Sequence, residues 1–181
     1  MKKVAVMLAE GFEEIEAITI VDVLRRADID AKFIGLNKKM LKGAHGIEIV
    51  ADEVFDEVDF SNYDMIALPG GLPGAKHLAR SKELGEVLRE FDKKDKWLAA
   101  ICAAPWGLST AGVLKDSYTC YPGFESQVAQ SGYKDDQNVV IDQNIITSRG
   151  PATAMEFALN LVKILEGKTK FQELKEGLLF K

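Results

Sequence analysis

Residues 97–105 have the sequence Trp97-Leu98-Ala99-Ala100-Ile101-Cys102-Ala103-Ala104-Pro105. The first five residues form an uncharged apolar run, which is typical of a strand buried on both faces of a parallel sheet. Pro105 predicts the start of a helix, because proline is favoured in the first helical turn, where its missing N–H costs no hydrogen bond. Cys102 is therefore predicted to lie at a junction between a buried strand and a helix.

The rest of the chain alternates between short apolar runs and longer amphipathic segments. We expect strands at Lys3–Leu8, Ala31–Gly35, Asp64–Leu68, Trp97–Ile101, Tyr118–Tyr121 and Ile145–Ser148. We expect helices at Glu14–Ala27, Leu84–Asp92, Pro105–Ala111, Phe124–Gln130, Pro151–Leu165 and Phe171–Leu178. Met40–Glu53 and Asn138–Ile146 are predicted to be antiparallel excursions, the second with Asp142-Gln143 at its turn. The alternation predicts an α/β fold with an open, doubly wound, mostly parallel sheet and helices on both faces.

Length and composition are those of one globular domain spanning residues 1–181. The chain is 47% hydrophobic and 28% charged, with 23 basic and 28 acidic residues and a net charge of -5. It has no basic block, which argues against a nucleic-acid-binding protein. Two cysteines and two histidines are too few for a disulfide framework or a zinc finger. We therefore expect no metal and a location in the reducing cytoplasm. We also expect no cofactor, because Gly167-Lys168-Thr169 and Gly70-Gly71-Leu72-Pro73-Gly74 both lack the spacing of a nucleotide-binding loop.

One stretch has the length of a membrane span. Residues 97–114 carry no charge over 18 positions, but they contain proline, glycine, serine and threonine. A buried strand followed by a buried helix explains the same stretch better. We expect no membrane partner.

Cys102 has two interpretations. A lone cysteine in an apolar run is usually a small buried hydrophobic residue. At a strand-to-helix junction, however, it has the placement of a nucleophile elbow, and a helix N-terminus lowers a thiol pKa. We therefore predict a reactive Cys102 with a depressed pKa.

Glu16 belongs to a group of four glutamates between residues 10 and 16, at the start of a predicted helix. Such a group ordinarily lies in solvent and stabilises the helix dipole. Glu16 also shares a helix face with Ile20 and Val23, at spacings of four and seven residues. A carboxyl on that apolar face is expected to be desolvated, so its pKa rises and its protonated form can donate to a thiolate.

The remaining candidates are less specific. Gly70 and Gly71 follow a predicted strand, and their lack of a Cβ lets a backbone N–H approach a reacting oxygen. His45 is most simply a turn residue. His77 follows the Gly-Gly loop at the start of a helix and is most simply a cap or surface residue, and neither histidine is beside Cys102 in the sequence. Cys120 is expected to pack along a short strand.

Four motifs, taken together and in this order, resemble the ThiJ/PfpI superfamily in its DJ-1-like branch. They are Leu8-Ala9-Glu10-Gly11-Phe12-Glu13-Glu14-Ile15-Glu16, Leu68-Pro69-Gly70-Gly71, Ala99-Ala100-Ile101-Cys102-Ala103-Ala104-Pro105 and Thr147-Ser148-Arg149-Gly150-Pro151. The resemblance implies a flavodoxin-like α/β sandwich, usually as a homodimer. It implies that Cys102 is the nucleophile, that Glu16 is its protonated partner, and that Gly71 and Ala103 supply oxyanion-type N–H donors.

The resemblance also implies which residues line the substrate pocket and two alternative functions. Gly70, Tyr121 and Arg149 are candidates for lining the substrate pocket. The family implies either detoxification of small aldehydes, dicarbonyls or glycated adducts, or a redox sensor or chaperone with an oxidisable cysteine. Peptidase activity is not expected, because Ala103 stands where the peptidase branch has a histidine. Tyr121 likewise stands where the DJ-1-like branch has a histidine before proline.

The helix expected at residues 14–27 is apolar on nearly every side, although only one side can face its own sheet. Ile15, Ile18 and Val21 are candidates for a second buried face. A homodimer is therefore expected.

Overall fold

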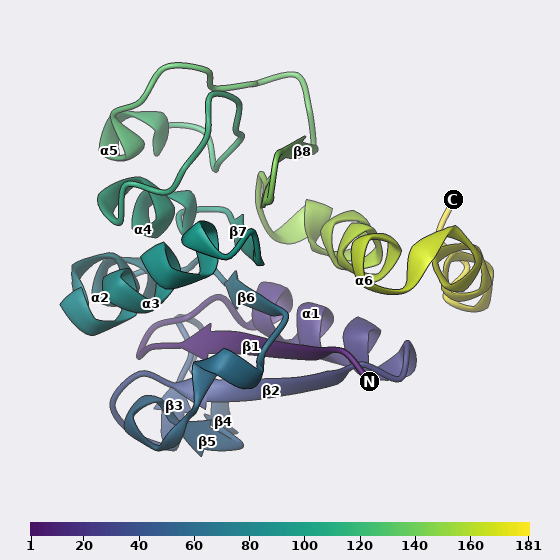
Figure 1. Ribbon diagram of the computed structural model, residues 1–181, viewed down its shortest axis with the longest axis horizontal. Helices are drawn as coiled ribbons and strands as arrows, with labels where there is room; N and C mark the ends of the chain where they lie inside the picture. The colour runs from purple at the N-terminus through teal and green to yellow at the C-terminus, as the bar shows by residue number, and fades with distance from the viewer.

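The computed structural model describes residues 1–181 and contains a seven-stranded sheet with the order β5-β2-β1-β6-β7-β9-β8 (Figure 1). Its strands are β1 (Lys3–Leu8), β2 (Asp30–Gly35), β5 (Glu53–Val54), β6 (Met65–Leu68), β7 (Trp97–Ile101), β8 (Val139–Asp142) and β9 (Ile145–Ser148). Every neighbouring pair is parallel except β8 and β9. The predicted mostly parallel, doubly wound sheet is confirmed.

Helices cover both faces of this sheet. They are α1 (Glu14–Arg26), α2 (Gly74–Arg80), α3 (Lys82–Lys93), α4 (Pro105–Thr110), α5 (Glu125–Val128) and α6 (Ala154–Gly177), with short 3₁₀ turns η1 (Phe55–Glu57), η2 (Phe60–Asn62) and η3 (Pro151–Thr153). α6 is broken at Gly167, which has a φ of 88°, so it corresponds to the two consecutive helices expected there. None of the helices is both long and apolar enough to cross a bilayer.

The core has two parts, one on each side of the sheet. Figure 1 shows α1 and α6 together on one side, and α2, α3 and α4 on the other. Val4 and Val6 of β1 pack in the cluster with α1 and α6, while Ala5 and Met7 pack in the cluster with α3 and α4. Because both faces are covered, the strands are apolar throughout. Val21 is 3% exposed within this core, so the expectation that it lies on a second, intersubunit face is wrong.

Both predicted antiparallel excursions are present. β3 (Met40–Lys42) and β4 (Glu48–Val50) form a separate hairpin, and β8 pairs with β9. Gln143 makes the second turn with a left-handed φ of 54°.

The strand expected at Tyr118–Tyr121 is wrong. Tyr118 forms only an isolated bridge with Tyr133, and the Thr119 N–H donates to the Thr147 side chain. β9 already pairs with β7 on one side and β8 on the other, so this segment cannot pair beside β9.

Two helices also differ from expectation. α2 begins at Gly74, three residues before His77, where a helix start is expected, because the loop at residues 70–73 is shorter than its glycines and proline indicate. α5 is shorter than predicted, because Ala129 adopts a left-handed conformation and ends it.

Candidate active site

Cys102 directly follows β7, at the edge of the sheet where the carboxyl ends of the parallel strands meet. Its φ is 64°, a left-handed conformation that is uncommon for a residue with a side chain. The Cys102 N–H donates to the Ser148 carbonyl, and the Cys102 carbonyl accepts from the Tyr121 N–H, both at 2.9 Å. These bonds hold the sharp turn between β7 and α4. The residue is 9% exposed.

Glu16 lies in the first turn of α1 and is completely buried. Its Oε2 accepts a hydrogen bond from the Gly70 N–H at 2.7 Å, whereas its Oε1 is buried and has no such partner. The carboxyl also interacts with the Cys102 thiol, which partly offsets the rise that burial causes in the pKa of Glu16 and adds to the rise that burial causes in the pKa of Cys102. A Cβ at Gly70 would lie 2.6 Å from the Cβ of Cys102 and 2.9 Å from Glu16 Oε2. Only a glycine therefore fits between the carboxyl and the cysteine.

Two backbone N–H groups face the sulfur of Cys102. They belong to Ala103 and Gly71, and both lower the pKa of the thiol. Gly71 has a φ of 86°, and a Cβ there would lie 2.3 Å from the backbone N of Glu13. The Gly70-Gly71 turn thus brings one donor to the sulfur and another to Glu16.

The electrostatics of the pair differ in part from expectation. Burial raises the pKa of Glu16 to about 7, as the helix spacing predicts. Burial, followed by the negative charge of Glu16, raises the pKa of the Cys102 thiol above its usual range and outweighs the N–H donors of Ala103 and Gly71. The expected depression of the Cys102 pKa is therefore wrong. α4 has only six residues, so its dipole is weak beside these two effects.

Tyr121 and Arg149 line a neighbouring cavity of about 260 Å³ together with Gly150. The Tyr121 side chain is exposed, and its ring lies so close to Gly150 that a Cβ there would come within 3.1 Å of it. The Arg149 guanidinium donates to the Asp135 carbonyl. Cys102 is not among the residues that line this cavity. It adjoins the cavity through its backbone hydrogen bond with Tyr121.

A further polar cluster was missed by sequence reasoning. His45, in the turn between β3 and β4, places Nδ1 2.9 Å from Glu14 Oε2 and 3.7 Å from Glu13 Oε2. The hydrogen bond with Glu14, together with the charges of both glutamates, raises the pKa of His45. These three side chains are the group whose spacing could hold a metal ion. No local sequence pattern links His45 to carboxylates more than 30 positions earlier.

His77 and Cys120 lie as expected. His77 is exposed at the surface, and Cys120 is buried.

The chain resembles known proteins over its whole length. Residues 2–164 match the model of the DJ-1/PfpI family. Drosophila melanogaster protein dj-1beta is 42% identical, covering 98% of this chain and 97% of that protein, and the crystal structure of Drosophila melanogaster DJ-1beta has a TM-score of 0.95 over 99% and 98% of the two chains. The glutathione-independent glyoxalase DJR-1.2 of Caenorhabditis elegans is 39% identical over 93% of this chain and 91% of its own. The oxidized Toxoplasma gondii DJ-1 structure has a TM-score of 0.92 at 34% identity, over 99% of each chain. The chain therefore belongs to the DJ-1/PfpI family.

Proposed function

We propose that this protein is a glutathione-independent glyoxalase-type enzyme of the stress response, which acts on small aldehydes or dicarbonyls through Cys102. The observation that carries the proposal is the placement of the thiol. Its sulfur is faced by two backbone N–H groups and by a buried carboxyl that titrates near neutrality. A nucleophile, a proton acceptor and two oxyanion donors are the groups that addition to a carbonyl requires.

In the first step the sulfur attacks the carbonyl carbon and a C–S bond forms. The thiol proton passes to ionised Glu16, and the carbonyl electron pair moves to oxygen, where the Gly71 and Ala103 N–H groups stabilise it. Glu16 then returns the proton to that oxygen, which gives a hemithioacetal. Because Glu16 accepts the proton during attack, the reaction does not need a thiolate at rest.

A dicarbonyl can react further at the same site. The hydrogen on the carbon bound to sulfur moves to the neighbouring carbonyl carbon by way of an enediol, and the product is a thioester of a 2-hydroxy acid. Water cleaves the C–S bond, releases the acid and restores the thiol. The balance is one dicarbonyl plus one water giving one hydroxy acid, with no external oxidant or reductant.

The surroundings of Cys102 favour a small substrate. A cysteine that is 9% exposed is open to a small carbonyl compound far more than to an adduct on a protein surface. The adjoining cavity offers the Tyr121 hydroxyl and the Arg149 guanidinium for a second polar group of the substrate. Gly70 contributes by leaving space between Glu16 and Cys102. Peptidase activity has the weakest support, because no imidazole pairs with Cys102 and residue 103 is alanine.

The second candidate function is a redox sensor. It is favoured by Glu16 Oε1, a buried oxygen without a hydrogen-bond partner that an oxygen of an oxidised Cys102 would supply. Two equivalents of peroxide oxidise a thiol first to a sulfenic and then to a sulfinic acid, with loss of one water at each step. A protonated Glu16 could donate to a sulfinate oxygen, beside the Ala103 and Gly71 N–H groups. The same thiol would then report oxidation without turnover.

Steady-state conversion of methylglyoxal separates the two candidates. We expect turnover by the unmodified protein, its loss in Cys102→Ser, and its retention in the matched control Cys120→Ala. Cys120 is a second free, buried thiol, so the control tests whether loss of any buried thiol is enough to abolish turnover. Equal background rates for the unmodified protein and Cys102→Ser would contradict the enzyme and leave the sensor.

The proposal includes a homodimer and a cytoplasmic location. Ile15 and Ile18 of α1 are 56% and 42% exposed, and Ile47 of the adjacent hairpin is 52% exposed. The hairpin lies against α1, because His45 and the Ile47 N–H both bond to Glu14, and we propose that these exposed side chains contribute to the dimer interface. The two free cysteines suit a reducing compartment.

A further inference from the structure

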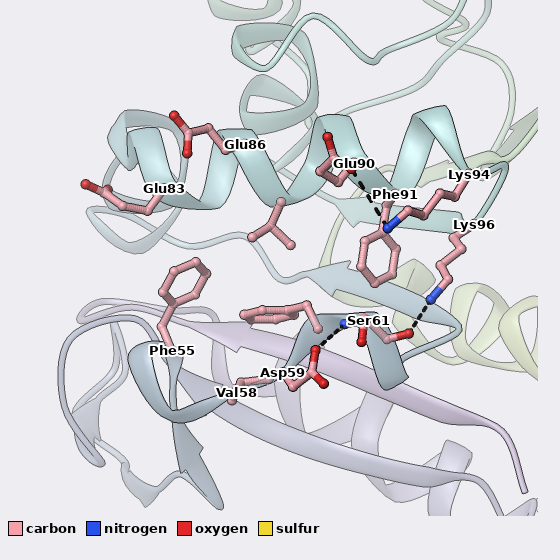
Figure 2. A pocket seen from close by; sticks show the side chains of 12 residues that line it. Phe55, Val58, Asp59, Ser61, Glu83, Glu86, Glu90, Phe91, Lys94 and Lys96 are labelled. Atoms are coloured by element: carbon pink, nitrogen blue, oxygen red, sulfur yellow. Dashed lines mark hydrogen bonds and ion pairs between the residues drawn. The ribbon is translucent and has the colours of Figure 1, made fainter.

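A second cavity, of about 490 Å³, lies between α3 and the segment that carries η1 and η2 (Figure 2). Its volume falls within the range of ~300–1,000 Å³ that small-molecule sites occupy. Its apolar surface is formed by Phe55, Val58, Phe60, Val87 and Phe91. Phe60 and Phe91 are buried, whereas the other three are half-buried and leave apolar surface facing the opening.

This cavity is separate from the candidate active site. Lys96, which lines the cavity, directly precedes β7, whereas Cys102 directly follows it. The rise of about 3.3 Å per residue along a strand places the two about 20 Å apart. The residues that line the cavity therefore have no part in the proposed chemistry of Cys102.

One end of the cavity holds cations that already have partners. Lys96 Nζ donates to the carbonyls of Ser61 and Tyr63, each at 2.7 Å, and lies 5.1 Å from the centre of the Phe91 ring. Lys94 Nζ lies 3.8 Å from Glu90 Oε2. Because both lysines already have partners, this end offers no unpaired cation to a charged ligand.

The other end is acidic and lacks cations. Figure 2 shows Glu83 at this end, across the cavity from Phe55. Glu83 makes a hydrogen bond with the Ser81 hydroxyl at 3.2 Å and no ion pair. Glu86 also makes no ion pair, and its carboxyl points away from the apolar surface (Figure 2). Asp59 lies beside Ser61, toward the Lys96 end, and accepts hydrogen bonds from Ser61 and Asn62. Lys82 lines a separate cavity, formed by residues of α2, α3 and α4, and does not line this one.

We propose that this cavity binds a small organic cation, with an aromatic or branched apolar body on the phenylalanine and valine side chains and an ammonium group between Glu83 and the Phe55 ring. Burial of the apolar body supplies most of the affinity. The carboxylate attracts the ammonium, and the ring face adds a cation–π contact. An anion with the same body is excluded, because no free cation lies at that end.

NMR titration of the full-length ¹⁵N-labelled protein tests this with three matched probes at constant ionic strength: 2-phenylethylammonium, neutral 2-phenylethanol and anionic 3-phenylpropionate. We expect amide shifts confined to residues 55–61 and 83–91. The ammonium should bind ~3- to 10-fold more tightly than the alcohol, which is the range for one exposed charge pair with a cation–π contact. The carboxylate should bind more weakly than both.

Two variants locate the effect. Glu83→Gln should abolish the preference for the ammonium and leave binding of the alcohol, whereas Val87→Gln should weaken all three probes by replacing part of the apolar surface with a neutral polar side chain. Glu176→Gln, an exposed carboxylate at the end of α6, is the matched control and should change nothing. Shifts elsewhere, no shifts with any probe, or an ammonium preference that persists in Glu83→Gln would each overturn the proposal.

Discussion

Glu16 accepts a hydrogen bond from the Gly70 N–H at 2.7 Å, although the two residues are 54 positions apart in the chain. The bond joins the first turn of α1 to the loop after β6, on the side of Gly70 that also faces Cys102. Gly70 satisfies one carboxyl oxygen and leaves the other without a partner. The carboxyl is therefore positioned by one oxygen and free to exchange a proton through the second.

Stability should depend on pH through Glu16. Its pKa is about 7 in the folded protein and near 4.5 when exposed, so the folded state binds more protons between these values. The free energy of unfolding should therefore fall as pH rises from 4.5 to above 7, by up to about 3 kcal/mol from this group. Glu16→Gln should flatten that part of the profile in urea unfolding. An unchanged pH profile in Glu16→Gln would contradict the raised pKa.

The reactivity of Cys102 should respond to Glu16 in two opposite ways. Glu16→Gln removes the negative charge that raises the thiol pKa, so alkylation by iodoacetamide should reach its midpoint at a lower pH. The same variant lacks a proton acceptor, so carbonyl turnover should fall. A Cys120→Ala background limits the alkylation signal to Cys102. A midpoint that stays the same or moves upward would show that the carboxylate does not act on the thiol.

Gly70→Ala should damage both the fold and the site. The added Cβ would lie 2.6 Å from the Cβ of Cys102, and we expect a loss of ~1–3 kcal/mol in the free energy of unfolding together with lower activity. Gly177→Ala is the matched control, because nothing lies within 4 Å of its added Cβ and alanine favours a helix. Chemical denaturation of the two variants measures the contrast. Equal stabilities would show that the backbone relaxes around the added methyl group.

Local pattern was enough to place much of this site, and it failed where distant segments decide the chemistry. The apolar run before Pro105 placed Cys102 at its turn, and the spacing of Glu16 from Ile20 and Val23 predicted its burial. The direction of the Cys102 pKa shift was missed, because burial of the thiol by the folded chain raises the pKa most, followed by the charge of a carboxyl from α1 that lies 86 positions away.

The remaining errors have the same origin. The strand expected at Tyr118–Tyr121 has β propensity, but β9 pairs with β7 and β8, and the segment forms only a single bridge outside the sheet. The contact of His45 with Glu14 depends on how the β3–β4 hairpin folds back over α1, which no local pattern shows.

Ile18→Glu should separate the proposed homodimer into subunits. A charge on this exposed apolar position costs little in the isolated subunit, whereas an apolar interface would have to bury it unpaired. Light scattering at micromolar concentration should give twice 19.9 kDa for the unmodified protein and 19.9 kDa for the variant. A subunit mass of 19.9 kDa before any substitution would contradict the dimer.

Tyr121→His should raise turnover. The Tyr121 N–H donates a hydrogen bond to the Cys102 carbonyl, and the Tyr121 side chain lines the adjoining cavity. An imidazole at position 121 is therefore expected to lie beside the reacting groups. An imidazole titrates at pH ~6.5 and can therefore act as a general base at neutral pH. A well-placed general base contributes ~10²–10⁴-fold, so kcat/KM for methylglyoxal should increase and its pH profile should gain a limb near neutrality.

Two controls complete this experiment. Tyr121→Phe removes the hydroxyl and keeps the ring, and it should show no new limb. Tyr121→His combined with Cys102→Ser should stay at background, because the added imidazole acts only with the thiol. A folded Tyr121→His protein with unchanged kcat/KM and an unchanged pH profile would mean that Tyr121 only packs against Gly150 and that its side chain lies outside the reacting site.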